Sequence, residues 1–120
     1  MVDLDKRLSV IVKACDDKRA FNIKVLDISK LSSIGDYFVI ASANSAVQVS
    51  AIADAVEEKM SKAGFKLIQK EGHNFSTWVL LDYGDIIVHI FKKEDRDFYN
   101  LERLWSDSDE LDVNLLISQE

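Results

Sequence analysis

The chain contains no proline, one cysteine, four glycines and no long apolar run. A single cysteine, Cys15, excludes an internal disulfide and a thiolate metal cluster. No stretch approaches the roughly 18 apolar residues that a membrane-spanning helix needs. The glycines are not spaced as in a phosphate-binding loop or a dinucleotide-binding fold. We therefore expect neither a membrane protein nor an enzyme of those nucleotide-binding classes.

Basic residues are fewer than acidic residues. The chain has 15 Lys and Arg against 21 Asp and Glu, a net charge of −6 at pH 7. Neutralised phosphates supply most of the affinity in nonspecific binding of nucleic acids, so this charge argues against direct nucleic-acid recognition and favours a basic protein partner. Residues 1–7 lack the apolar core of a signal peptide and the Arg and Ser richness of a transit peptide. We therefore expect a cytoplasmic protein.

The 120 residues, of which 48% are hydrophobic, suffice for one domain with its own core. Helical and alternating apolar patterns predict the element order α-β-β-α-β-β-β-α. Helices are expected over residues 4–17, 45–63 and 94–105, and strands over 21–28, 36–42, 65–71, 77–82 and 85–91. These elements predict a two-layer α/β domain over residues 1–106, with a mixed sheet of about five strands and helices on its aliphatic face. Residues 107–120 are expected to form an acidic tail of uncertain structure.

Local signals refine this order. Residues 36–42 are apolar on both faces, which is typical of a central strand. Ser45 with Gln48 has the form of a capping box that opens the middle helix. The strand at 65–71 is expected to return beside residues 36–42 through a right-handed crossover. The last helix is expected to turn these side chains inward: Phe98, Leu101, Leu104 and Trp105.

A hairpin within residues 77–91 is the most informative segment. Tyr83 and Gly84 are expected to form its turn, with Asp82 opposite Asp85. Because side chains alternate along a strand, the two faces of the hairpin can be assigned. The aliphatic face carries Val79, Leu81, Ile86, Val88 and Ile90. The other face, which has the mixed composition of a recognition surface, carries Trp78, Leu80, Asp82, Asp85, Ile87, His89 and Phe91.

Asp82, Asp85 and His89 admit two interpretations. Carboxylates and an imidazole on one face could hold a divalent cation or move protons. Aspartates beside a turn are also favoured for local hydrogen bonds, and a histidine opposite Trp78 is a common cross-strand contact. We favour the second interpretation, because no Ser or Cys nucleophile is legible nearby in the sequence. Cys15 falls within the apolar stripe of the first helix, so we expect a buried structural thiol.

Several stretches, long and correctly spaced, match one known family. They are residues 36–42, 48–54, 71–72, 78–91 and 96–105. On these residues the chain resembles the ribosomal silencing factor family, also called Iojap, from the first helix to Trp105.

The resemblance implies a small, homodimeric, cytoplasmic factor with a nucleotidyltransferase-like α/β fold and no enzymatic activity. Members of that family bind the large ribosomal subunit through large-subunit protein fourteen. They thereby obstruct joining of the small subunit and lower translation when nutrients are scarce. The chain lacks the Gly-Ser and paired aspartates that a working nucleotidyltransferase needs for its metal, so no metal or cofactor is expected.

The mixed face of the hairpin and this resemblance together suggest a steric mechanism. The residues expected to contact a basic-rimmed patch of the ribosomal protein are Glu71, Trp78, Leu80, Asp82, Tyr83, Asp85, His89, Arg96 and Tyr99. Trp78 and Leu80 would be the buried anchors, and the carboxylates would steer the encounter. Two alternatives stay open: a metal-dependent nucleotidyl transfer that uses Asp82 and Asp85, and an oligomerisation module in which the same face forms the homodimer.

Overall fold

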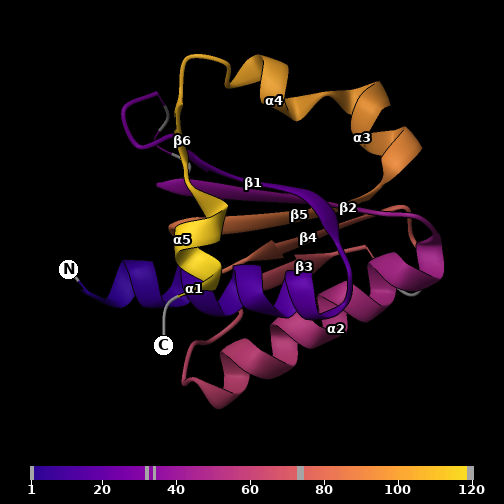
Figure 1. Ribbon diagram of the computed structural model, residues 1–120, viewed down its shortest axis with the longest axis horizontal. Helices are drawn as coiled ribbons and strands as arrows, with labels where there is room; N and C mark the ends of the chain where they lie inside the picture. Colours follow the sequence, from indigo (N-terminus) through magenta and orange to yellow (C-terminus); the bar gives the residue numbers. More distant parts are fainter. Residues whose placement is uncertain (1, 32, 34, 73–74, 119–120) are drawn as a thin grey trace.

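A six-stranded mixed sheet lies between two groups of helices (Figure 1). The computed structural model describes residues 2–31, 33, 35–72 and 75–118. The strands are β1 (Phe21–Asp27), β2 (Tyr37–Ala43), β3 (Gln69–Glu71), β4 (Trp78–Asp82), β5 (Ile86–Lys92) and β6 (Asp109–Leu111), in the spatial order β3-β4-β5-β2-β1-β6. The helices on one face are α1 (Val2–Asp17), α2 (Ala46–Lys62) and α5 (Val113–Ile117). Those over the other face are α3 (Lys93–Tyr99) and α4 (Leu101–Leu104).

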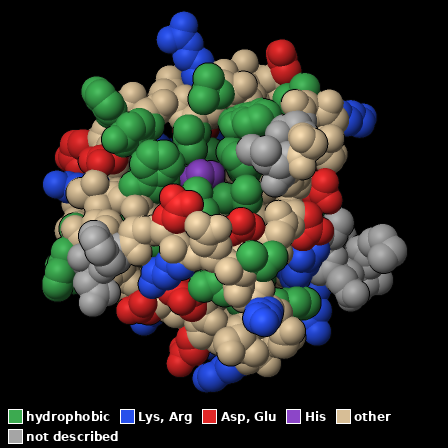
Figure 2. All heavy atoms as spheres, turned by 180° about the vertical axis from the view of Figure 1, so that it is seen from behind, with side chains coloured by type: hydrophobic (Ala, Val, Ile, Leu, Met, Phe, Trp, Pro, Cys, Tyr) green, Lys and Arg blue, Asp and Glu red, His purple; other side chains and the backbone are tan. Residues whose placement is uncertain are grey.

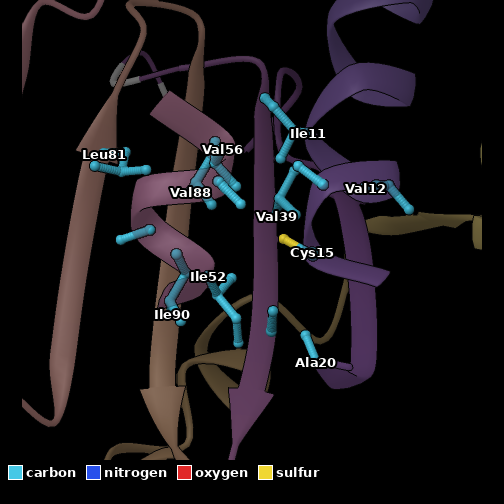
Figure 3. Packing of buried hydrophobic residues seen from close by; sticks show 14 of the residues in the cluster. Ile11, Val12, Cys15, Ala20, Val39, Ile52, Val56, Leu81, Val88 and Ile90 are labelled. Carbon is cyan, nitrogen blue, oxygen red and sulfur yellow. The ribbon is translucent and has the colours of Figure 1, made fainter. Parts of the chain in front are cut away.

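The main core fills the space between the sheet and the helices α1, α2 and α5 (Figure 3). Apolar residues at helical spacing form the inner stripes of the two long helices: Leu8, Ile11, Val12 and Cys15 from α1, and Val49, Ile52, Ala53, Val56 and Met60 from α2. All the residues predicted for the aliphatic face of the hairpin are buried against them, which confirms that face. Burial of each large apolar side chain contributes about 1.5–3 kcal/mol.

The centre of the sheet is the parallel pair β2 and β5. Strand β2 is buried along nearly its whole length, which confirms its predicted central place. Helix α2 follows it and begins with the predicted capping interaction, in which Ser45 Oγ accepts a hydrogen bond from the Gln48 N–H at 3.1 Å. The Gln48 side chain reaches back to the Asn44 N–H, at 2.7 Å. The two bonds satisfy amides that the helix itself cannot.

The prediction for residues 65–71 is wrong. The strand that returns beside β2 is β5, and only Gln69–Glu71 of the earlier segment form a strand, which pairs with β4 at the edge of the sheet. All the residues of β3 are exposed, whereas β5 is buried over most of its length. The strand that can bury apolar side chains on both faces therefore takes the central position.

The hairpin strands keep their predicted faces but not their predicted register. Leu80 pairs with His89 instead of Ile87, a shift of two residues. The turn lies at Gly84 and Asp85, because the Tyr83 N–H donates to the Ile86 carbonyl at 2.9 Å and Gly84 has φ +96°. Since side chains alternate with a period of two, this shift leaves every strand residue on the same face. The prediction for Asp85 is wrong: it lies in the turn, and its carboxylate binds Arg7 of α1 on the aliphatic side of the sheet instead of joining the mixed face.

The last predicted helix is broken into α3 and α4. Asn100 adopts the left-handed conformation, with φ 46° and ψ 57°, and interrupts the helical period. Leu101 and Trp105 pack against a second apolar cluster, as predicted. Phe98 and Leu104 do not, because they are 81% and 74% exposed. The two short helices cover part of the second face of the sheet, so the fold has helices on both faces and not the predicted two layers.

Residues beyond α4 also join the fold. Strand β6 pairs antiparallel with β1, which gives the sheet six strands where about five were expected. Helix α5 packs on α1, where Ser9 Oγ donates to the Leu116 carbonyl at 2.7 Å.

Candidate protein-binding face

The sheet carries a second apolar cluster on the side of α3 and α4, built on Leu26, Ile28, Phe38, Ile40 and Phe91. We call its outer surface the aromatic face and define it by Trp78, Leu80, Ile87, His89 and Tyr99. Figure 2 shows apolar side chains gathered around a histidine, with acidic side chains close by. This histidine is His89, the only histidine among the residues that the structure describes.

Trp78 is half-buried and held from several sides. Its ring centroid lies 4.8 Å from that of Phe91, with which it stacks, and 4.8 Å from that of Tyr99. Its Nε1 donates a hydrogen bond of 3.2 Å to Nδ1 of His89. The indole is therefore fixed in place before any partner arrives, which lowers the entropy cost of using it as an anchor.

His89 is only 4% exposed. Its ring meets the ring of Phe38 edge-on, with 4.8 Å between centroids. Burial lowers the pKa of His89 to about 4, so the imidazole is neutral at pH 7. Because Nδ1 accepts from Trp78, the assigned tautomer carries its proton on Nε2, which has no hydrogen-bond partner in the described part of the chain. The contact with Trp78 was predicted, although the two residues lie diagonally across the strands instead of directly opposite.

A pocket of about 240 Å³ opens at one side of the aromatic face, lined by Glu71, Gly72, Trp78 and Leu80. Gly72 has φ +92°, and a Cβ atom there would lie 2.7 Å from the Trp78 carbonyl oxygen. Only glycine fits this close approach of β3 to β4. Glu71, which is exposed, places a carboxylate at the rim of the pocket.

The two aspartates of the hairpin have structural partners. Oδ1 of Asp82 accepts a hydrogen bond from the Gly84 N–H at 2.8 Å, the local turn bond that we favoured from the sequence. Both carboxylate oxygens of Asp85 bind the guanidinium of Arg7 in α1, at 2.8 and 2.9 Å. The hydrogen bond from Arg7 lowers the pKa of Asp85. Among the described residues, no group of His, Cys, Asp or Glu side chains could hold a metal ion.

Tyr83 and Arg96 lie away from the aromatic face. Tyr83 is 6% exposed within the main core, and burial raises its pKa to about 12. Arg96 is 5% exposed and donates to the Asn22 carbonyl, to Ser42 Oγ at 2.7 Å and to the Glu102 carboxylate. Through these bonds Arg96 of α3 holds α3 and α4 together and holds both against β1 and β2.

The structure thus brings Glu71, Trp78, Leu80, His89 and Tyr99 together and separates the other candidates from them. Asp82 stays at the turn end of the same strand face. Residues 71–72 entered the sequence analysis only as part of the family resemblance. The structural role of Gly72 was missed, because the close approach that requires it depends on the pairing of β3 with β4. Cys15 is buried as predicted, and burial raises the pKa of its thiol to about 12. Within the described ranges, no helix is long and apolar enough to cross a membrane.

Residues 2–120 match the family described as "Ribosomal silencing factor during starvation". The chain belongs to the ribosomal silencing factor family. A ribosomal silencing factor from Bacillus subtilis is 41% identical over 112 residues, which are 93% of this chain and 95% of that protein. The chloroplastic protein Iojap of Zea mays is 33% identical over 106 residues, 86% of this chain and 45% of that protein.

Solved structures agree with the family assignment. A crystal structure from Chromobacterium violaceum has a TM-score of 0.80 and 35% identity, and the match covers 88% of this chain and 87% of that one. Another, from Bacillus halodurans, has a TM-score of 0.77 and 37% identity, with coverage of 88% and 95%. The mixed α/β sheet described above is therefore shared with these proteins. Silencing factors are ribosome-associated regulators, so the predicted family and its general role are confirmed.

Proposed function

We propose that this protein binds the large ribosomal subunit in the cytoplasm through large-subunit protein fourteen. Its bulk then occupies space that the small subunit needs, and translation falls when nutrients are scarce. The observation that carries the proposal is the aromatic face, where a fixed and half-buried indole lies beside a pocket with a carboxylate at its rim. Occupation of a site requires no chemical step.

The composition of the face fits a basic protein partner. Large aromatic side chains in partly formed pockets supply most of the binding free energy in protein interfaces, and Trp78 and Tyr99 have that character. Glu71 and Asp82 add negative charge nearby, on a chain whose net charge is −6. Complementary charge of this kind speeds the encounter with a basic surface and orients it. The described geometry argues against nucleotidyl transfer by these aspartates. The Asp82 carboxylate accepts a hydrogen bond within the turn, and the Asp85 carboxylate binds Arg7.

We also propose that the free protein is a homodimer whose interface overlaps the aromatic face. Tyr99, which is 47% exposed, would then contact either a second copy or the ribosomal protein. Light scattering can measure the mass of the protein alone and with the isolated ribosomal protein. Replacement of the dimer by a one-to-one complex supports overlap, and a dimer that persists unchanged in the complex refutes it.

The direct test of the blocking function is a subunit-joining assay. Purified large subunits are incubated with saturating protein, small subunits are added, and joined particles are measured by light scattering. We expect joining to slow strongly with the wild-type chain and with Leu115→Ala, which alters an exposed leucine on α5, on the opposite side of the sheet. Equal joining rates with and without the wild-type protein would end the proposal.

A further inference from the structure

A second hollow lies at the far end of the sheet from the hairpin turn. Its volume is about 390 Å³, and residues of β1, β2, α3 and α4 line it. It is more polar than the pocket at Trp78, and it shares no lining residue with that pocket. Nothing in the proposed docking on the ribosome uses it.

The position of this hollow is one where α/β sheets bind ligands. Strands β2 and β5 are parallel neighbours, and the chain leaves β2 toward α2 on one face of the sheet and leaves β5 toward α3 on the other (Figure 1). The carboxyl ends of the two strands therefore form a topological switch point, where open sheets have a crevice for ligands. Ser42 near the end of β2 and Lys93 just after β5 both line the hollow.

One wall of the hollow is rigid. The Arg96 guanidinium is fixed by the Asn22 carbonyl, by Ser42 Oγ and by the Glu102 carboxylate, which its Nε and Nη2 approach to 3.2 and 3.1 Å. Asn22 has φ 49°, at an irregularity of the pairing between β1 and β2. Irregularities of this kind are frequent beside binding sites, where they redirect the backbone.

The hollow also offers groups without partners. Lys24 and Lys93 line it, and neither amine makes an ion pair or hydrogen bond within the described part of the chain. The Glu102 carboxylate is not available in the same way, because one oxygen is bonded to Arg96 and the other is closed off from solvent. Asp97 adds a second carboxylate to the lining.

We propose that this hollow binds a small phosphate ester that carries hydroxyl groups, such as a sugar phosphate. The amines of Lys24 and Lys93 bind the phosphate oxygens, and charge-assisted hydrogen bonds of this type are among the stronger polar contacts. The Asp97 carboxylate, which is exposed, accepts hydrogen bonds from the hydroxyl groups. Phe21 contributes apolar surface against the carbon skeleton. The site is one of recognition, and no bond of the ligand is made or broken.

Nuclear magnetic resonance titration of the full chain tests the proposal, with ribose 5-phosphate and inorganic phosphate as the probes. We expect saturable shifts at Phe21, Lys24 and Lys93 with ribose 5-phosphate, and a dissociation constant of about 1 mM or tighter. The double variant Lys24→Ala/Lys93→Ala should weaken binding by about tenfold or more, the usual loss when a charged hydrogen-bonding group is removed. Lys66→Ala, which removes an exposed lysine after the C-terminal end of α2, is the matched control and should change nothing.

The hydroxyl contacts have their own test. Asp97→Asn should weaken binding of ribose 5-phosphate and leave binding of inorganic phosphate unchanged, because Asp97 meets only the sugar. Equal weakening of both probes would refute the assigned orientation. Shifts that do not saturate, or that survive in the double lysine variant, would show nonspecific contact with surface amines and overturn the site.

Discussion

The indole Nε1 of Trp78 donates a hydrogen bond of 3.2 Å to Nδ1 of His89 on the neighbouring strand. The proposed anchor of the docking surface is thus joined to a buried neutral imidazole. The bond fixes both the orientation of the indole and the tautomer of the histidine. Loss of either partner affects the other.

Stability should fall on mild acidification because of His89. Burial lowers its pKa to about 4 in the folded chain, below the ordinary value of 6.5. The unfolded chain therefore binds more protons between these two values, and stability decreases as the pH falls through that window. From pH 7 to pH 5 we expect the free energy of unfolding in urea to drop by about 2 kcal/mol from this group.

The variant His89→Phe is the control for this pH dependence. Phenylalanine has a similar shape and does not titrate, so the decrease between pH 7 and pH 5 should shrink by most of that amount. An unchanged pH dependence in this variant would assign the effect to other groups.

Trp78→Ala should weaken binding to isolated large subunits by about 2 kcal/mol or more, roughly 30-fold, as for a central aromatic anchor. Co-sedimentation at several protein concentrations measures the affinity, and circular dichroism checks that the variant is folded. Leu115→Ala removes an equally apolar, 65% exposed side chain and should bind normally. Normal binding by a folded Trp78→Ala chain would remove Trp78 from the docking surface.

Arg96→Ala should lower the free energy of unfolding by about 3 kcal/mol or more, because Glu102 loses the partner of a buried ion pair. Arg103→Ala, which removes an exposed arginine from the adjoining helix α4, should cost less than about 0.5 kcal/mol. Urea denaturation of both variants measures the difference. Similar small losses in the two variants would show that Arg96 does not fasten α3 and α4.

Gly72→Ala and Gly64→Ala form a matched pair, because the two glycines have φ of +92° and +88°. At Gly64 nothing lies within 4 Å of an added Cβ, so we expect only the backbone cost of about 1–2 kcal/mol. At Gly72 the Cβ would meet the Trp78 carbonyl oxygen at 2.7 Å, and the loss should be clearly larger. Thermal unfolding compares the two, and equal losses would mean that β3 shifts away without cost.

The sequence predicted those features that depend on local periodicity. The faces of the hairpin, the capping interaction at Ser45 and the buried thiol of Cys15 all follow from spacing along a single element. The register of the hairpin does not, because either of two overlapping residue pairs could form the turn next to Gly84. Because side chains alternate with a period of two, a shift of two residues leaves the faces unchanged. The pattern of apolar residues therefore cannot distinguish the two registers.

Contacts between distant segments could not be predicted. Arg96 was expected to contact the ribosomal protein, but its carbonyl partner on Asn22 is 74 residues away. Asp85 looked available for a partner, but Arg7 lies 78 residues earlier in the chain. Such long-range pairs depend on the order of strands in the sheet, and that order was itself wrong for residues 65–71.

The sealed thiol of Cys15 has a practical benefit. Thiol-directed dyes react with the thiolate, which is scarce at neutral pH when the pKa is about 12, and the sulfur is shielded by α1 and the sheet. A single cysteine engineered into the exposed outer side of α5 would accordingly take up a fluorophore alone. The native residue would need no prior removal, and the labelled chain could report on its encounters in real time.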